Sequence, residues 1–258
     1  MPGSVVTVLA PRGGSGKTVL ACNLAVVLGL AGASVCLVDL DLAEGDVAGF
    51  LGLEGPASVM SAASPDGHLV GELLETVLQP YGYGVDCVLA PQLPGDSEKI
   101  SADFVEEMLT LLRSRYDYVV VDTPKRMSAR VQAALDVASH HVLVGTPAAP
   151  ALHSLRRMID VLDLLCIPQA ERSVLLNHAD TPRTLSDAVV TGIVRSPVAG
   201  RLPDSPEVMV SINQRLPLAV STPANPYVRA VRAFAAMRLL PSGDQCHGRL
   251  APPPGIAS

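Results

Sequence analysis

APRGGSGKT, residues 10–18, is the stretch that decides how the chain folds. Its three glycines are followed by a lysine and a threonine, as in loops that wrap the phosphates of a nucleotide. Pro11, however, stands where the strict pattern G-x-x-x-x-G-K-S/T has its first glycine. The flanks still favour such a loop, because a β-branched apolar run ends at Ala10 and a helical pattern begins at Lys17.

The residue types in this loop suit phosphate binding for separate reasons. Gly13, Gly14 and Gly16 let the backbone turn its N–H groups inward and approach phosphates closely. The helix that begins at Lys17 directs its positive dipole end at them. Lys17 can reach the β- and γ-phosphate oxygens, and the Thr18 hydroxyl can bind Mg²⁺. A chance glycine turn is the alternative, but G-G-x-G-K-T arises by chance in roughly 3 chains of this length per 10,000.

Composition places the chain among globular proteins. Of its 258 residues, 48% are apolar and 17% are charged, which allows one large domain with a sizeable core. The formal charge of −6 argues against a dedicated nucleic-acid binder. The five cysteines form no C-x-x-C pair, which favours buried, reduced thiols.

One apolar stretch is long enough to cross a bilayer. Residues 19–38 are twenty uncharged, mostly apolar positions. The run directly follows the lysine of the loop, is interrupted by Gly29, Gly32 and Ser34, and ends in VDLD. We therefore interpret it as a buried helix, a turn and a buried parallel strand. The chain shows no N-terminal signal peptide, so we expect a cytoplasmic protein.

Short apolar runs alternate with helical patterns along the chain. This alternation predicts an α/β fold of three layers, in which a mostly parallel, twisted sheet of about seven to eight strands has helices on both faces. We expect one domain over residues 1–240 and a disordered tail, rich in proline and glycine, over residues 241–258. Strands are predicted at residues 5–10, 34–40, 86–90, 118–122, 141–146, 173–177 and 198–202, and helices near 17–30, 67–79, 101–115, 128–138, 150–165, 184–194, 205–215 and 225–240.

Three aspartates follow predicted strands. Asp39 and Asp41 lie at the carboxyl end of one strand, and Asp122 ends another. Ligands of parallel sheets bind at this edge, and phosphoryl transfer needs carboxylates near the metal and an acceptor that orients the attacking water. Asp122 is the natural partner of Mg²⁺ through water, while one of Asp39 and Asp41 can support the metal and the other can orient the water. Alternatively, these aspartates only start turns.

With these residues, the sequence resembles the ParA/MinD family of deviant Walker-A ATPases, in the SIMIBI class of P-loop NTPases. The family's loop reads K-G-G-x-G-K-S/T, so it does not use the glycine that is missing here. Within the family the chain is most similar to the CpaE/TadZ branch, which is associated with assembly and polar positioning of Flp/Tad pili. The stretches VDLDLAEGDVAGFLGL, YDYVVVDTP, SVLLNHAD and INQRLPLAV stand in that branch's order and spacing, and the resemblance covers about residues 4–238.

The resemblance implies an ATP- and Mg²⁺-binding P-loop NTPase domain and a role for each residue of its site. Asn177 stands where family members hydrogen-bond adenine, and Pro203 and Asp204 fall in the loop that packs against the base. An amide offers adenine both a donor and an acceptor, although asparagine after a strand is also a common turn residue. The implied catalytic residues are Lys17, Asp41 and Arg12; the nucleotide-binding residues are Gly13, Gly14, Ser15, Gly16, Lys17, Thr18, Val19, Asn177, Pro203 and Asp204; and the metal-binding residues are Thr18, Asp39 and Asp122.

Two positions depart from the family pattern. Arg12 occupies the place of the signature lysine, which in relatives reaches across a dimer to the partner's nucleotide. Arginine keeps the charge, but its planar fork is larger and differently hydrated, so it is either an arginine finger or a tolerated cation. After the strand that ends at Asp122, relatives have D-T-P-P, whereas this chain has DTPKRMS. Lys125 and Arg126 could supply a cation near the γ-phosphate or could be solvated loop charges.

These features leave three hypotheses from different classes. The first is an ATP-hydrolysing dimerisation switch that positions or assembles a cell-envelope machine such as a Flp/Tad pilus, recruited to a cell pole or to the inner face of the membrane by partner proteins. The second is a ParA-like DNA-segregation ATPase, which would contact phosphates through Arg229, Arg232 and Arg238 on the last helix. The third is a catalytically weak nucleotide-binding scaffold. A MinD-type membrane anchor is disfavoured, because the tail contains Pro252 to Pro254 and no amphipathic period.

Overall fold

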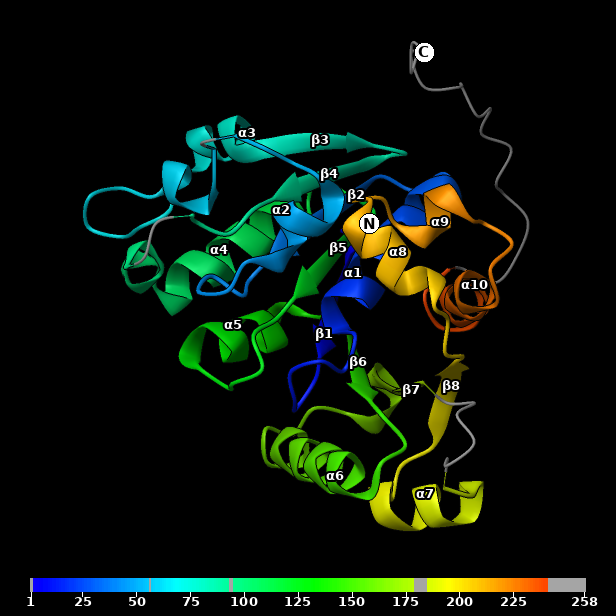
Figure 1. Cartoon of the computed structure of the whole chain (residues 1–258). Coiled ribbons are helices and arrows are strands. Elements are labelled where there is room, and N and C mark those ends of the chain that lie inside the picture. The colour runs from blue at the N-terminus through cyan, green and yellow to red at the C-terminus, as the bar shows by residue number, and fades with distance from the viewer. Residues whose placement is uncertain (1, 56, 93–94, 179–184, 241–258) are drawn as a thin grey trace, which may run out of the picture.

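An eight-stranded sheet forms the centre of the protein (Figure 1). The computed structural model describes residues 2–55, 57–92, 95–178 and 185–240. The strands lie in the order β3-β4-β2-β5-β1-β6-β7-β8, and all neighbours are parallel except β3 and β4 at one edge. The predicted mostly parallel sheet is therefore confirmed. The strands are β1 (Ser4–Leu9), β2 (Val35–Asp39), β3 (Leu78–Gly82), β4 (Val85–Val88), β5 (Tyr118–Asp122), β6 (His140–Gly145), β7 (Arg172–Asn177) and β8 (Val198–Leu202).

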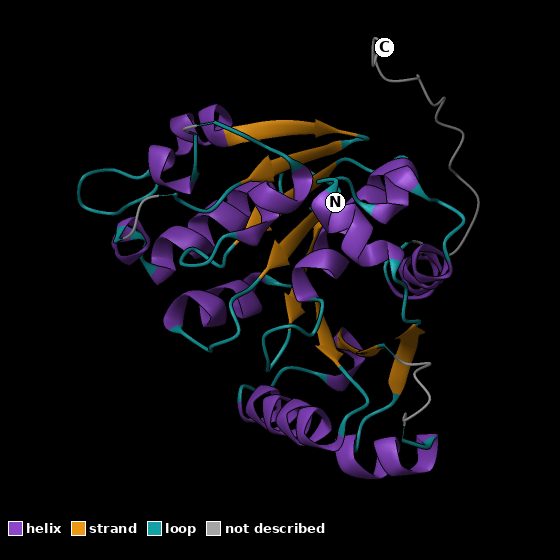
Figure 2. Ribbon diagram, in the orientation of Figure 1, coloured by secondary structure: helices purple, strands orange, loops and turns teal. Residues whose placement is uncertain are grey.

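Helices cover both faces of this sheet, as Figure 2 shows. On β5, Val120 packs into the apolar cluster under α1 and α10, whereas Val119 and Val121 pack into the cluster under α4 and α5. Uniformly apolar strands are what a sheet buried on both sides requires. The α-helices are α1 (Lys17–Leu30), α2 (Asp46–Leu51), α3 (Leu74–Val77), α4 (Ala102–Leu112), α5 (Ala129–Val137), α6 (Ala149–Leu164), α7 (Asp187–Val194), α8 (Glu207–Asn213), α9 (Leu218–Ser221) and α10 (Pro226–Arg238).

The apolar stretch at 19–38 forms the predicted helix, turn and strand. Helix α1 is buried without interruption from Leu20 to Leu28, because it lies between the sheet and α10. Gly32, with φ of 95°, makes the turn into β2. Within the part of the chain that the structure describes, every helix is too short or too polar to cross a membrane. The predicted disordered tail at 241–258 lies outside the described residues.

The prediction of one helix over residues 67–79 is wrong. The structure has a 3-10 turn at Gly71–Leu73, the one-turn helix α3, and then β3, which pairs antiparallel with β4. The antiparallel pairing follows from a tight connection in which Gly82, Tyr83 and Gly84 all have positive φ. Helices α2 and α9 were not predicted, since six and four residues are too few to show a helical period. Cys166 is exposed, whereas Cys22, Cys36 and Cys87 are buried as predicted.

Two adjacent histidines in β6 are buried. His141 Nδ1 and the Thr7 hydroxyl share a hydrogen bond of 2.9 Å, and His140 Nε2 and the Ser173 hydroxyl share one of 3.0 Å. Burial lowers the pKa of each imidazole to about 4, and a neighbouring positive charge adds to the effect: Arg238 for His140, and His140 for His141. Both side chains are therefore neutral at physiological pH.

These histidines predict a loss of stability in acid. The unfolded chain, with an ordinary histidine pKa, binds more protons than the folded chain as pH falls from about 6.5 to 4. Their contribution to the unfolding free energy is thus complete above pH 6.5 and declines through this window. When the pH is lowered from 7.5 to 5, we expect the unfolding free energy of the His141→Gln variant to fall by about 2 kcal/mol less than that of the native sequence. Urea unfolding at several pH values measures this, with exposed His153→Gln as the control; parallel profiles for all three proteins would contradict it.

Candidate nucleotide-binding site

The glycine-rich loop connects β1 to α1 at the carboxyl edge of the sheet. Gly14 and Gly16 have φ of 74° and 84°, the left-handed conformation that favours glycine. The Ser15 hydroxyl donates to the carbonyl oxygen of Arg12 at 2.8 Å, which closes the turn. Gly16 is the N-cap of α1, and no side chain caps this end of the helix. The first N–H groups of α1 are thereby left to an anion, as a phosphate loop requires.

A single buried carboxylate joins this loop to the sheet. Asp122 accepts a hydrogen bond from Lys17 Nζ on one oxygen and from Thr18 Oγ1 on the other, both at 2.7 Å. Residue pairing of β1 with β5 sets Val8 opposite Asp122, which explains why the carboxylate lies beside the loop. Burial raises the pKa of Asp122, while the charge of Lys17 and the two hydrogen bonds oppose that rise.

The other two predicted aspartates lie next to this contact. Asp39 ends β2 directly opposite Asp122 in the pairing of β2 with β5. Its oxygens accept hydrogen bonds from the backbone N–H groups of Asp41 and Val47, each at 3.1 Å. Burial, and then the negative charge of Asp122, raise the pKa of Asp39 to about 8. Asp41 lies beyond the end of the strand and is partly exposed; burial raises its pKa as well, and the charge of Lys17 opposes this.

These groups fit a magnesium nucleotide. Two buried carboxylates side by side, each with a raised pKa, gain from a nearby divalent cation that favours their charged forms. Magnesium is commonly held by one or two carboxylates together with substrate phosphates and water. Among the described residues, no group of three or more His, Cys, Asp or Glu side chains is placed to hold a metal ion. The Thr18 hydroxyl, with Asp39 and Asp122 behind it, would bind the cation.

The residues predicted to hold the base are brought together from β7 and β8. Asn177 ends β7 and is 5% exposed, and its Nδ2 donates to the carbonyl oxygen of Ser15 at 3.0 Å. Its Oδ1 accepts from the backbone N–H of His178 at 3.1 Å. The His178 ring contacts Asp204 Oδ1 at 2.7 Å from Nδ1, and Pro203 and Asp204 directly follow β8. His178 was missed by the sequence interpretation, although it stands in the quoted stretch SVLLNHAD.

The loop cations have partners within the chain. Arg12 is exposed, and its Nε donates to the hydroxyl of Ser154 on α6 at 3.2 Å. Arg157 donates to the same oxygen at 3.1 Å. Neither Ser154 nor Arg157 could be found from the loop motif, because only the tertiary fold brings α6 beside it. Lys125 forms an exposed ion pair with Glu44 at 2.7 Å, which links the loops that follow β5 and β2.

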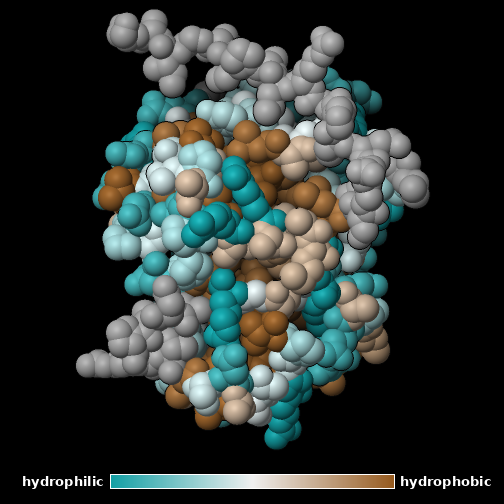
Figure 3. Space-filling view, turned by 90° about the vertical axis from the view of Figure 1, so that its right-hand side faces the viewer, coloured by the Kyte–Doolittle hydropathy of each residue, from teal (hydrophilic) through white to brown (hydrophobic). Residues whose placement is uncertain are grey.

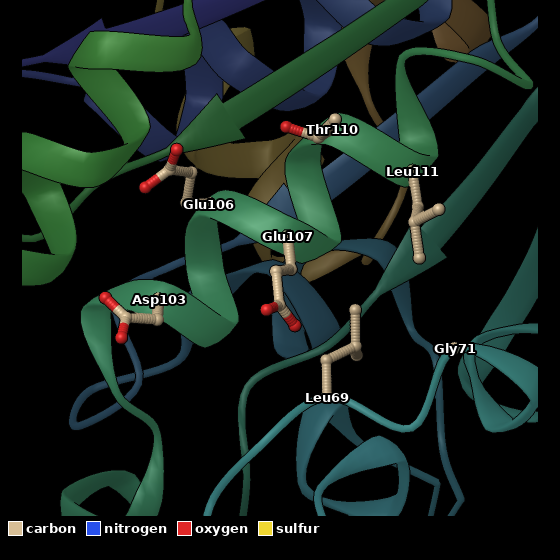
Figure 4. Close-up of a pocket in the computed structure, with 7 residues that line it drawn as sticks. All are labelled: Leu69, Gly71, Asp103, Glu106, Glu107, Thr110 and Leu111. Carbon is tan, nitrogen blue, oxygen red and sulfur yellow. The ribbon is translucent and has the colours of Figure 1, made fainter.

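A separate hollow of about 600 Å³ lies beside α4, away from the loop (Figure 4). Glu107 of α4 points across the gap toward Leu69, whereas Asp103 and Glu106 point to one side. Because its charged groups are carboxylates, this hollow does not suit phosphate.

Comparison with known proteins agrees with this geometry. Residues 6–218 match the family described as the CobQ/CobB/MinD/ParA nucleotide binding domain. The chain belongs to this family. The resemblance to ParA/MinD ATPases that the loop and the aspartates indicate is therefore confirmed, whereas the narrower CpaE/TadZ branch stays a prediction.

Relatives within the MinD/ParA family cover nearly the whole chain. The putative septum site-determining protein MinD of Guillardia theta is 26% identical over 84% of this chain and 81% of its own length. The structure of MinD from Pyrococcus horikoshii in complex with Mg-ADP superposes with a TM-score of 0.80 at 20% identity, over 91% of this chain and 95% of that one. The MinC:MinD cell division complex of Aquifex aeolicus gives 0.71 at 21% identity, over 90% and 94%. These structures establish the shared fold.

The three loop glycines predict a graded series of stabilities. A Cβ at Gly16 would lie 2.3 Å from Asn177 Nδ2, whereas a Cβ at Gly13 or Gly14 would meet nothing within 4 Å. We expect Gly13→Ala to change the unfolding free energy by less than about 0.5 kcal/mol and Gly14→Ala to lower it by about 1 kcal/mol through its positive φ. Gly16→Ala adds the clash and should cost about 3 kcal/mol. Urea unfolding measures all three, and equal losses at positions 14 and 16 would show that Asn177 moves aside freely.

Proposed function

We propose that the protein binds and hydrolyses ATP with Mg²⁺ and dimerises around the nucleotide, and that this switch positions or assembles a cell-envelope machine. The observation that carries the proposal is the contact of Lys17 and Thr18 with the two oxygens of Asp122. It brings the loop lysine, the loop hydroxyl and the carboxylate at the end of β5 to one point. That is the set of groups that phosphoryl transfer in P-loop enzymes uses.

Each residue of the site has a proposed part in this reaction. Bound Mg-ATP supplies the phosphoanhydride bond, with the metal neutralising part of its charge. With Mg-ATP bound, Lys17 would turn from Asp122 to the β- and γ-phosphate oxygens, and Thr18 and Asp122 would be the residues that hold the metal, Asp122 through water. Asp39 supports that shell, and Asp41 accepts a hydrogen bond from the attacking water and orients it. The backbone N–H groups from Gly13 to Val19 bind the phosphates, while Asn177, Pro203 and Asp204 hold the adenine.

Arg12 decides whether the chain is a dimerisation switch. Its exposed guanidinium is held in its own subunit by one hydrogen bond of 3.2 Å to Ser154, so little has to be broken for it to reach a partner subunit. Arginine binds phosphate bidentately and stays charged, which suits it to act across a dimer on the partner's nucleotide. If Arg12 instead stays on Ser154, the same fold gives a scaffold with weak or no turnover.

Which cell-envelope machine the switch serves is inferred from similarity to other proteins, because the nucleotide site itself does not identify it. The MinD relatives point to the positioning of cell division, and the MinC:MinD complex to a protein partner. The order of the motifs favours a Flp/Tad pilus instead. Both are envelope machines served by partner proteins. The side of the molecule that carries α8, α9 and α10 offers apolar surface among polar side chains (Figure 3), and Met209 and Val210 of α8 are 61% and 50% exposed.

Light scattering tests the switch directly. We expect the Asp41→Ala variant with ATP and Mg²⁺ to run at about twice the monomer mass of 26.8 kDa, because blocked turnover traps the dimer. Arg12→Ala in the same background should return it to the monomer, and so should Lys17→Ala, which removes the phosphate contact. Arg232→Ala, an equal loss of charge on the exposed side of α10, should leave the dimer intact. A monomer at every ATP concentration in Asp41→Ala would exclude the dimer switch and leave the scaffold.

The DNA-binding alternative predicts a different result. Arg229, Arg232 and Arg238 are exposed on α10, but Arg238 donates to the backbone carbonyls of Ala170 and Arg172 and so is bound to its own chain. Together with the net charge of −6, this leads us to expect no ATP-dependent retardation of duplex DNA in a gel, even at low salt. A shift that requires ATP, weakens with salt and disappears in Arg229→Ala/Arg232→Ala would favour DNA segregation instead.

A further inference from the structure

A pocket of about 740 Å³ lies at the amino end of the sheet, where β6, β7 and β8 begin. His140, Arg172 and Val198 are the first residues of these strands, and all three line the pocket together with Met237 and Arg238 from the end of α10. The nucleotide site described above is built at the carboxyl ends of the strands. The two sites therefore lie at opposite ends of the strands, and the pocket takes no part in the proposed ATP chemistry.

The guanidinium of Arg238 is fixed in this pocket without a carboxylate partner. Its Nη2 donates to the carbonyl oxygens of Ala170 at 3.1 Å and Arg172 at 3.2 Å. Among the residues that the structure describes, no acidic side chain forms an ion pair with it. Two main-chain contacts thus hold the charged group in place and leave its Nε and Nη1 donors to a ligand. A guanidinium held in this way is organised in advance to bind an oxyanion.

A second arginine, Arg172, also lines the pocket and, unlike Arg238, has a buried side chain. The Arg172 side chain is only 7% exposed; its Nη1 pairs with Asp163 at 2.6 Å and its Nη2 donates to the carbonyl oxygen of Ile167. The Nε of Arg172 is buried and has no hydrogen-bond partner. A buried donor without a partner carries a free-energy cost that is relieved when an acceptor arrives. Burial, and then the charge of Arg238, lower the pKa of His140, which lines the same pocket.

The pocket is open to solvent, and its remaining wall combines apolar residues with the polar side chains of Gln169 and Ser196. Pro197, Val198 and Ala199 line one part of it, and Met237 is 71% exposed. A small free anion would leave this apolar surface in water, and a small molecule would be poorly enclosed, since such ligands are normally buried over most of their surface. A segment of another protein can cover both the arginine and the apolar surface of the pocket at once. Methionine adapts well to such contacts.

From these contacts we infer that the pocket is a docking site for an acidic segment of a partner protein. A carboxylate of that segment pairs with Arg238, and an apolar side chain next to the carboxylate packs on Met237 and Val198. Because the pocket lies at the opposite ends of the strands from the nucleotide site, we expect its occupation not to depend on the ATP-driven switch.

The probe for this site is a synthetic hexapeptide that alternates leucine and glutamate. The protein is labelled with ¹³C at its seven methionine methyl groups, and the Met237 resonance is assigned by Met237→Ser. We expect the peptide to shift the Met237 resonance, both with and without Mg-ATP. By fluorescence anisotropy with a labelled peptide, Arg238→Gln should weaken binding about tenfold, as the loss of one charge-assisted pair does, and Met237→Ser should weaken it as well. Arg232→Gln, the same change on an exposed position of the same helix, should have no effect.

Two control ligands test whether binding depends on the carboxylates and on the peptide as a whole. The same peptide with glutamine in place of glutamate should bind at least tenfold more weakly, and inorganic phosphate should not displace the acidic peptide at equal concentration. An unshifted Met237 resonance, equal effects of Arg238→Gln and Arg232→Gln, or equal binding of the glutamine peptide would each overturn the proposal. Displacement by phosphate would overturn it too, because the pocket would then be a simple anion site. Thermal unfolding of each variant, with a midpoint close to that of the native sequence, establishes that the pocket residues were changed in a folded protein.

Discussion

The structure depends on the buried carboxylate of Asp122, which accepts hydrogen bonds from both Lys17 and Thr18. A charged group at this depth is costly unless it is paired. The pairing holds the first turn of α1 against the end of β5, and it fixes the glycine-rich loop between them. Because β1 and β2 flank β5, Asp39 at the end of β2 lies directly beside Asp122. In the function proposed above, nucleotide would replace this existing set of charged contacts and would not have to create one.

The sequence predicts the parts of this site that local chemistry dictates. Glycines that need positive φ, a lysine and threonine at a helix start, and aspartates that end apolar strands are recognisable before any fold is known. The architecture followed for the same reason, since buried parallel strands have a distinct pattern. The sequence could not predict that Asn177 bonds to the loop carbonyl of Ser15, or that Arg12 rests on Ser154. Those contacts join residues more than 140 positions apart, and only the packing of β7 and α6 creates them.

The elements that the sequence did not predict, or predicted wrongly, share one property. Residues 67–79 and the short helices α2 and α9 are held by tertiary contacts and show little local periodicity. The turn at Gly82, Tyr83 and Gly84 makes β3 antiparallel to its neighbour β4. The residues before this turn had been predicted as a helix. This edge lies far along the strand order from the loop. The wrong prediction therefore left the interpretation of the site unaffected.

The depth at which α1 lies has a consequence for which loop residues can vary. From Leu20 to Leu28 this helix is enclosed, so any substitution that shifts its start must also displace the sheet or α10. Arg12, Gly13 and Gly14 face solvent instead. Substitutions in the loop are therefore tolerated only at these exposed positions, which are also the positions that a binding partner can contact. A cation at position 12 can accordingly be exchanged to suit a new neighbour while the interior of the protein stays as it is.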